Sequence, residues 1–86
     1  MINFSNKKII ITGATGGIGN ELVKKFITLG GNVLATGTNE KKLEDLKKNY
    51  TSLEILRFDI SKQSEIENFI EQGQSKLKGL DILVNN

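Results

Sequence analysis

Cysteine, histidine, tryptophan and proline are all missing from this chain of 86 residues. Without cysteine there is no disulfide, thiolate nucleophile or cysteine-bound zinc, and without histidine there is no Ser-His-Asp triad and no imidazole metal ligand. No apolar run is longer than the three isoleucines at residues 9–11, which is far too short to span a membrane. The N-terminus also lacks the apolar segment of a secretory signal. These absences predict a cytoplasmic protein with no metal site and no membrane contact.

Charge is nearly balanced, with 12 lysines and arginines against 10 acidic residues and a net charge of +2. All but one of the basic residues are lysines, and over residues 40–48 they alternate with acidic residues in the manner of a solvated helix face. A nucleic-acid-binding module would instead gather its basic residues on one face and add stacking aromatics or arginines. We therefore expect no nucleic-acid partner.

Strand-like and helix-like segments alternate along the chain. Short apolar runs predict four strands, at residues 8–12, 32–36, 53–58 and 81–86. Apolar residues at helical spacing predict three helices between them. The first covers residues 17–29, the second follows a cap at Thr38 or Asn39, and the third runs from a cap at Ser61 to Gly79.

This alternation, with short links, is typical of parallel strands joined by right-handed crossovers. The predicted fold class is α/β, with part of a doubly wound, Rossmann-type parallel sheet in the strand order 3-2-1-4. The first two helices are expected on one face of the sheet and the third on the other. No domain boundary is expected within residues 1–86.

Residues 12–19, with the sequence Thr-Gly-Ala-Thr-Gly-Gly-Ile-Gly, join the first strand to the first helix. Gly13 is expected to allow a tight turn, Gly16 or Gly17 to let the backbone approach a pyrophosphate, and Gly19 to let the helix pack closely on the sheet. N–H groups at the start of the helix would bind the diphosphate. The alternative is a glycine-rich turn without a ligand, but a strand before it and an amphipathic helix after it are typical of dinucleotide sites. The predicted contacts are Gly13, Ala14, Thr15, Gly16, Gly17, Ile18 and Gly19.

The residues after the second strand, 36–39, include no acid before Glu40. NAD-binding sites usually place Asp or Glu there to hold the ribose 2′-hydroxyl, and a carboxylate would repel a 2′-phosphate. Hydroxyl, amide and helix N–H groups accept a phosphate, and Lys41 or Lys42 adds positive charge. The sequence thus favours NADP(H), with NAD(H) as the alternative. Thr38 and Asn39 are also suited to simple helix capping.

Polar residues follow the third and fourth strands as well. Asp59 is placed to accept a hydrogen bond from the adenine amino group, or else it is a turn residue ahead of Ser61. Asn85 and Asn86 close the fourth strand at the same carboxyl edge of the sheet, where ligands bind in such folds. Their side-chain amides are expected to tie strand ends together or to line the cofactor.

Together these residues resemble the N-terminal part of a classical short-chain dehydrogenase/reductase. Residues 12–19 match the family's TGxxxGIG, Asp59 with Ile60 resembles its adenine contact, and residues 81–86 match the start of its DxLVNNAG motif. Within the family the chain is most similar to the bacterial 3-oxoacyl-[acyl-carrier-protein] reductases of fatty acid synthesis. The glycine spacing also satisfies the GxxGxxG of extended relatives that act on nucleotide sugars, although residues 83–86 favour the classical group.

The resemblance implies a place along the cofactor for each motif. Residues 13–16 would lie beside the pyrophosphate and Thr38 beside the ribose 2′ position. Asp59 and Ile60 would lie beside adenine, and Asn86 beside the nicotinamide-side ribose. Many NADP-dependent relatives carry a basic residue just before the second glycine of their motif, where this chain has Gly16.

The family's catalytic Ser and Tyr-x-x-x-Lys pair are not found in this sequence. Its single tyrosine is Tyr50, and the fourth residue after it is Glu54 instead of lysine. We therefore expect a cofactor-binding portion, truncated after the fourth strand, marginally stable and inactive alone. The exposed fourth strand would pair with a C-terminal partner chain or with a second copy. The alternatives are an active half of a split reductase and a non-catalytic nucleotide-binding or interaction fragment.

Overall fold

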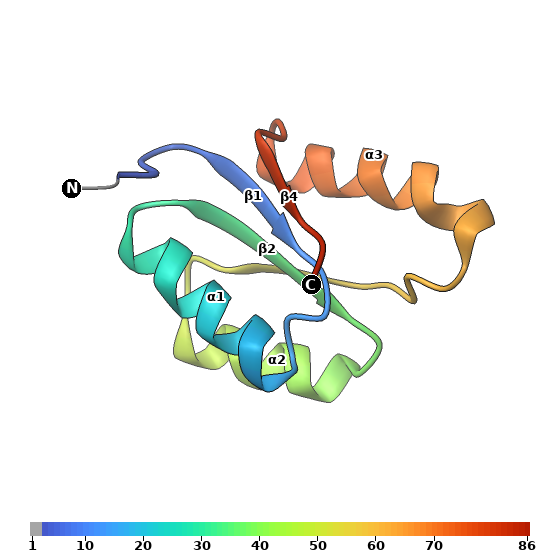
Figure 1. The fold of residues 1–86 in the computed structure, drawn as a ribbon, viewed down its shortest axis with the longest axis horizontal. Helices are drawn as coiled ribbons and strands as arrows, with labels where there is room; N and C mark the ends of the chain where they lie inside the picture. The colour runs from blue at the N-terminus through green and yellow to red at the C-terminus, as the bar shows by residue number, and fades with distance from the viewer. Residues whose placement is uncertain (1–2) are drawn as a thin grey trace.

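Four parallel strands form one sheet in a computed structural model that describes residues 3–86 (Figure 1). The order across the sheet is β3-β2-β1-β4, so the two outer strands are the last two in sequence. Every neighbouring pair is parallel. The predicted fold class and strand order are thereby confirmed. The strands are β1 (Lys8–Ile11), β2 (Asn32–Gly37), β3 (Glu54–Arg57) and β4 (Ile82–Val84).

Three α-helices connect the strands, namely α1 (Gly17–Thr28), α2 (Glu40–Asn49) and α3 (Ile66–Leu77). Gly30 follows α1 with φ +93°, the left-handed conformation expected of a glycine that stops a helix. Of the two predicted caps of α2, Asn39 is the one used: its side chain accepts a 3.0 Å hydrogen bond from the Lys42 N–H. The polar residues after β2 therefore do start a helix.

The predicted cap at Ser61 is wrong. Its hydroxyl and N–H both donate to Asp59 Oδ1, at 2.7 and 3.0 Å, and so close a local turn. A short 3₁₀ segment, Gln63–Glu65, comes next, and α3 begins only at Ile66 without a side-chain cap. Asp59 thus binds the Ser61 hydroxyl that was expected to cap the helix. Short polar side chains often form such local hydrogen bonds to nearby residues in place of a helix.

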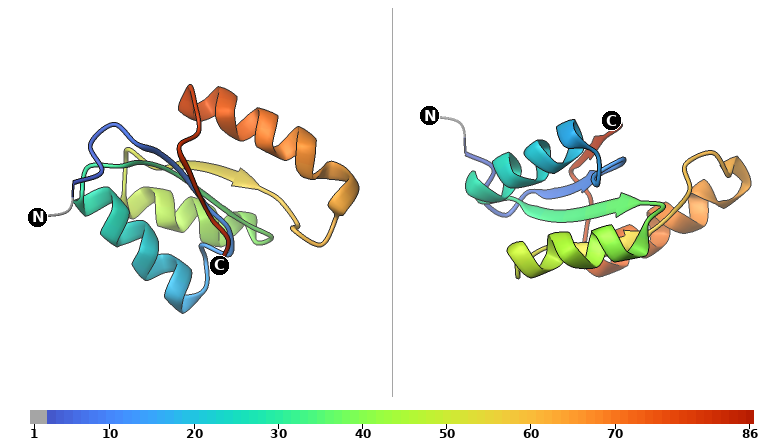
Figure 2. Two further views of the ribbon diagram at one scale, coloured as in Figure 1. Left: turned by 45° about the horizontal axis from the view of Figure 1, so that its top comes forward. Right: turned by 90° about the horizontal axis from the view of Figure 1, so that it is seen from below.

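The two faces of the sheet are covered unequally, as the left view of Figure 2 shows. Ile9 and Ile11 of β1 face α1 and α2, where they pack against side chains such as Val23 and Leu43. Ile10 faces the other way, toward Phe69 and its neighbours on α3. This is the predicted division of the helices. No helix among the described residues combines the length and apolar character needed to cross a membrane.

Candidate functional site at the carboxyl edge of the sheet

The loop between β1 and α1 needs two of its glycines for its own shape. Gly13 has φ +59°, and a Cβ there would lie 3.2 Å from the carbonyl oxygen of Asn86. A Cβ on Gly19 would overlap the carbonyl oxygen of Gly13 and lie 2.8 Å from Cα of Ala14. Gly13 therefore forms the expected turn, and Gly19 allows close packing of α1 as expected, but against Gly13 and Ala14 of the loop and not against the sheet.

The other two glycines face open space. A Cβ on Gly16 would meet only the Gly13 carbonyl oxygen, at an ordinary 3.7 Å, and a Cβ on Gly17 would meet nothing within 4 Å. Gly16 has φ −77°, which any residue adopts, and no side chain caps the first turn of α1. The first N–H groups of a helix have no partner within the helix. The loop therefore leaves a bare backbone and free donors at the start of α1, an arrangement suited to a phosphate.

The end of β4 is tied to the end of β1. The Thr12 hydroxyl lies 3.3 Å from both the Val84 carbonyl and Asn85 Oδ1, and it accepts a 3.0 Å hydrogen bond from the Asn86 N–H. Asn86 Nδ2 donates to the Gly13 carbonyl at 3.1 Å. The two asparagines thus hold strand ends together, which was one of the two roles expected of them.

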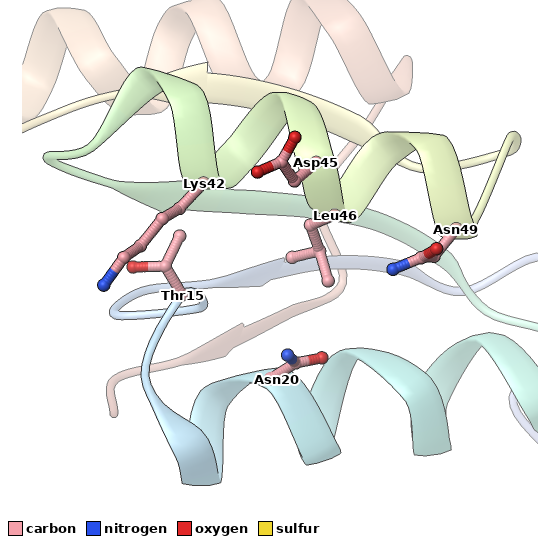
Figure 3. A pocket seen from close by; sticks show the side chains of 6 residues that line it. All are labelled: Thr15, Asn20, Lys42, Asp45, Leu46 and Asn49. Carbon is pink, nitrogen blue, oxygen red and sulfur yellow. The ribbon is translucent and has the colours of Figure 1, made fainter.

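A groove between α1 and α2 opens beside this loop (Figure 3). Its volume is about 250 Å³, and polar groups from both helices line it. The Lys42 side chain extends past Thr15 at one end, and Thr15 also lies close to Gly37, where a Cβ would be 3.3 Å from Thr15 Oγ1. Of the two lysines expected to add charge, Lys42 is therefore the one beside the glycine loop. The lining residues are Thr15, Asn20, Lys42, Asp45, Leu46 and Asn49.

Arg57 is a residue that the sequence patterns did not single out. It ends β3, pairs with Gly37 of β2, and donates a 2.9 Å hydrogen bond from Nε to the Thr38 carbonyl. The guanidinium thus lies against the turn between β2 and α2. Only a side-chain contact between two segments nineteen residues apart reveals this placement.

Asp59 and Ile60 follow β3 at the same edge. The hydrogen bonds from Ser61, with smaller contributions from the charges of Lys62 and Arg57, hold the pKa of the Asp59 carboxyl below its usual value. Ile60 is half exposed, as is unusual for so large an apolar side chain. Asp59 therefore does form the turn expected of it, and its other carboxylate oxygen, Oδ2, has no hydrogen bond among the described residues.

The fold thus brings the predicted residues to one edge. Ala14 N donates to the Thr36 carbonyl at 3.0 Å, which joins the glycine loop to the end of β2. Phe58 N donates to the Gly37 carbonyl at 3.0 Å, which brings the segment containing Asp59 alongside. One anomaly lies between them: the buried Thr36 hydroxyl has no hydrogen-bond partner among the described residues.

The sequence profile of the short chain dehydrogenases matches residues 7–86. The chain belongs to this family. It is 41% identical over 90 aligned positions to the 3-oxoacyl-[acyl-carrier-protein] reductase FabG of Rickettsia typhi, covering all of this chain and 34% of the reductase. It is 34% identical over 79 positions to the NADP-dependent 3-hydroxy acid dehydrogenase YdfG of Escherichia coli K12. That alignment covers 91% of this chain and 32% of the dehydrogenase.

Solved structures of family members superpose closely. A hydroxysteroid dehydrogenase from Escherichia coli gives a TM-score of 0.90 at 32% identity, over 98% of this chain and 37% of its own. A 3-ketoacyl-(acyl-carrier-protein) reductase from Brucella melitensis, solved with NADH, gives a TM-score of 0.86 at 27% identity, over 94% of this chain and 34% of its own. This short-chain dehydrogenase chain thus spans about a third of the length of the relatives it matches.

Short-chain dehydrogenases bind a nicotinamide dinucleotide, and the residues of this chain fit such a group. The open space at Gly16 and Gly17 accommodates a diphosphate against the N-terminus of α1. Ile18 and Ile60, which were both predicted to contact the cofactor, have exposed apolar side chains. The redox chemistry would be that of the nicotinamide ring, and the chain's own contribution is binding and orientation.

Proposed function

We propose that this chain is the NADP(H)-binding portion of a short-chain reductase, with residues 1–86 forming the N-terminal part of its dinucleotide-binding domain. The observation that carries the proposal is the division among the loop glycines. Gly13 and Gly19 are required by internal contacts, whereas Gly16 and Gly17 leave space that nothing in the fold fills. A loop that only needed to turn would have no use for the second pair.

The proposed cofactor lies along the carboxyl edge of the sheet. Its diphosphate binds the loop backbone and the start of α1. Thr38 lies at the adenosine ribose and Asn86 at the nicotinamide-side ribose. Asp59 accepts from the adenine amino group through its unengaged oxygen, and Ile60 packs on the ring. The residues proposed to contact the cofactor are Gly13, Ala14, Thr15, Gly16, Gly17, Ile18, Gly19, Thr38, Asp59, Ile60 and Asn86.

The preference for NADP(H) over NAD(H) rests on charge at the end of β2. No carboxylate occupies residues 36–39, where it would hold a 2′-hydroxyl and repel a 2′-phosphate. Lys42 extends past Thr15 on the same side of the sheet. Similarity to FabG proteins and to an NADP-dependent dehydrogenase supports a reductase, with 3-oxoacyl-[acyl-carrier-protein] as the proposed substrate class of the complete enzyme.

We propose that the chain has no reductase activity by itself. The only tyrosine, Tyr50, ends α2, and α2 starts at the carboxyl edge and runs back toward the opposite one. Tyr50 packs against the core below α1 and α2 instead of facing the glycine loop. Glu54 stands where the family's lysine would follow, so this tyrosine does not form the Tyr-x-x-x-Lys pair.

A partner along β4 is the second part of the proposal. β4 lies at one end of the sheet order, and Leu83 is 49% exposed in the middle of it. An apolar, parallel edge with unpaired backbone groups is a template for another strand. A C-terminal polypeptide of the same family, or else a second copy of this chain, would cover it. Sedimentation of the purified chain distinguishes a monomer, which argues against the second copy, from a dimer, which supports it.

Titration of the purified chain with NADPH and NADH, followed by calorimetry, tests the proposed cofactor site. We expect saturable binding that is tighter for NADPH. Gly16→Val and Gly17→Val should each raise Kd at least about tenfold while leaving the melting temperature nearly unchanged, because they fill only the proposed ligand space. Ser52→Val, at the opposite edge, is the matched control and should bind normally. No saturable binding at millimolar cofactor contradicts the proposal.

A further inference from the structure

We propose that Arg57 is the residue that selects a 2′-phosphorylated ribose. The inference rests on the proposed function, since it names the side chain that reads one group of the cofactor already placed at the carboxyl edge. It comes from a contact between β3 and the turn after β2, a part of the edge outside the glycine motif.

Geometry places the Arg57 guanidinium beside the proposed ribose position. Arg57 pairs with Gly37, so its side chain lies on the same face of the sheet as α1 and α2. Its Nε donates to the carbonyl oxygen of Thr38 at 2.9 Å. That bond fixes the planar group against the residue expected at the 2′ position.

The charge of Arg57 is not neutralised by a contact. Among residues 3–86 the one ion pair within 4.0 Å joins Lys48 to Asp45 on α2. The Arg57 charge acts on Asp59 only as the smallest of several contributions to its lowered pKa. Arginine carries five N–H donors, and a single one of them is engaged here, so the fork remains available to an anion.

The chemistry of the side chain favours Arg57 over the lysines of α2 as the selecting residue. A guanidinium binds phosphate through two parallel N–H donors and holds its charge at any physiological pH, whereas a lysine is a flexible point charge. The Lys42 side chain extends past Thr15, and its ammonium has no hydrogen bond among residues 3–86. Gly16 brings no side-chain charge to the glycine loop, whereas Arg57 brings one to the same edge of the sheet from another strand.

Binding of adenosine 2′,5′-bisphosphate and adenosine 5′-monophosphate to the full chain, measured by calorimetry, tests this assignment. Both probes need only the adenine half of the site, and they differ in the 2′-phosphate alone. We expect the wild type to prefer the bisphosphate. Arg57→Gln should raise Kd for the bisphosphate by about tenfold or more and change Kd for the monophosphate less than about twofold.

Two further variants keep the test decisive. Arg57→Lys retains the charge but loses the paired N–H donors and the hydrogen bond to Thr38. Its Kd for the bisphosphate should lie between those of the wild type and Arg57→Gln, and it can be measured even where Arg57→Gln fails to fold. Lys76→Gln removes one positive charge at the end of α3, beside Lys8 at the opposite edge, and should leave both affinities unchanged.

The remaining outcomes separate this inference from the proposed function. If Arg57→Gln weakens the binding of both probes equally, Arg57 only holds the turn in place. If it leaves binding of the bisphosphate unchanged, other groups select the 2′-phosphate. Either result overturns the inference alone. A wild type that binds both probes equally overturns the inference and also the proposed preference for NADP(H), but not dinucleotide binding itself. A wild type that binds neither probe at millimolar concentration overturns the proposed function and this inference with it.

Discussion

The two halves of the carboxyl edge are built differently. On the β1–β4 half, Asn86 donates hydrogen bonds to the Thr12 hydroxyl and the Gly13 carbonyl, across more than seventy residues of sequence. On the β2–β3 half, Arg57 reaches only the neighbouring turn and Asp59 only its own loop. The side chains that close β1 and β4 form hydrogen bonds within the fold, whereas the second half keeps exposed groups, such as Asp59 Oδ2, without a hydrogen bond among the described residues.

Two threonines show the contrast at closest range. Thr12 follows Ile11 and Thr36 follows Ala35, and Ile11 and Ala35 pair in register on neighbouring strands. The Thr12 hydroxyl takes part in three hydrogen bonds, whereas the buried hydroxyl of Thr36 takes part in none among the described residues. We infer that substitutions on the β1–β4 half lower stability, and that substitutions on the β2–β3 half change ligand binding more than stability.

The largest effect is expected for Gly19→Val. The added side chain would overlap the Gly13 carbonyl and displace α1 from the loop, lowering the free energy of unfolding by about 3 kcal/mol or more. Urea denaturation followed by circular dichroism measures it. Gly17→Val, two residues earlier in open space, is the control and should stay within about 1 kcal/mol of wild type. Equal losses in the two variants would remove the distinction between the glycine pairs.

The next largest effect is expected for Gly13→Ala. It should lower the free energy of unfolding by about 1–3 kcal/mol, because alanine is strained at φ +59°. Steric exclusion of the cofactor is not the reason, since the new Cβ would face Asn86. Gly16→Ala, at an ordinary φ, should be neutral or stabilising by up to about 1 kcal/mol. Thermal unfolding of both variants checks the order, and a Gly16→Ala variant less stable than Gly13→Ala would contradict it.

Replacing the two threonines should change the free energy of unfolding by smaller amounts, and the two replacements should differ in direction. Thr12→Val removes the acceptor of the Asn86 N–H and should cost about 1–2 kcal/mol. Thr36→Val replaces a buried, unpaired hydroxyl by a methyl group of similar size and should be neutral or slightly stabilising. Chemical denaturation of both variants compares them directly. A comparable loss in Thr36→Val would show that its hydroxyl has a partner after all.

The smallest effect concerns the ionisation of Asp59. Its folded-state pKa is lowered, so the ionised carboxylate stabilises the fold above its ordinary pKa of about 4, and this contribution is lost as the pH falls through the lower folded value. The stability difference between wild type and Asp59→Asn should therefore be largest near neutral pH and shrink in acid. Denaturation series at several pH values measure it, and a difference that grows on acidification would contradict the assigned sign.

Much of the fold was predictable because its signals are local. Runs of isoleucine and valine, the glycines at positions 30 and 31, and apolar residues at helical spacing each act within a few residues. The start of α3 was mispredicted because Asp59 and Ser61 each offer hydrogen bonds to the other, and sequence alone does not rank a turn against a cap. The strand ends also differ from the predicted ones by one or two residues.

The site was predictable where a motif carries it and not where tertiary contacts do. The glycine loop and the closing asparagines stood out by type and spacing. The bond from Arg57 to Thr38 and the missing partner of Thr36 depend on how β3 and β2 align, which no local pattern specifies. The division of the glycines into two required and two open ones also depends on contacts between residues that no local pattern specifies.

The position of Tyr50 has a consequence for spectroscopy. The chain has no tryptophan, and its one tyrosine packs into the core at the far end of α2 from the glycine loop. Ultraviolet emission from the protein therefore reports on the integrity of that core. Emission from a reduced nicotinamide, excited at longer wavelength, would report on the ligand alone. Unfolding and binding can thus be followed in one sample as two separate optical channels, without a label.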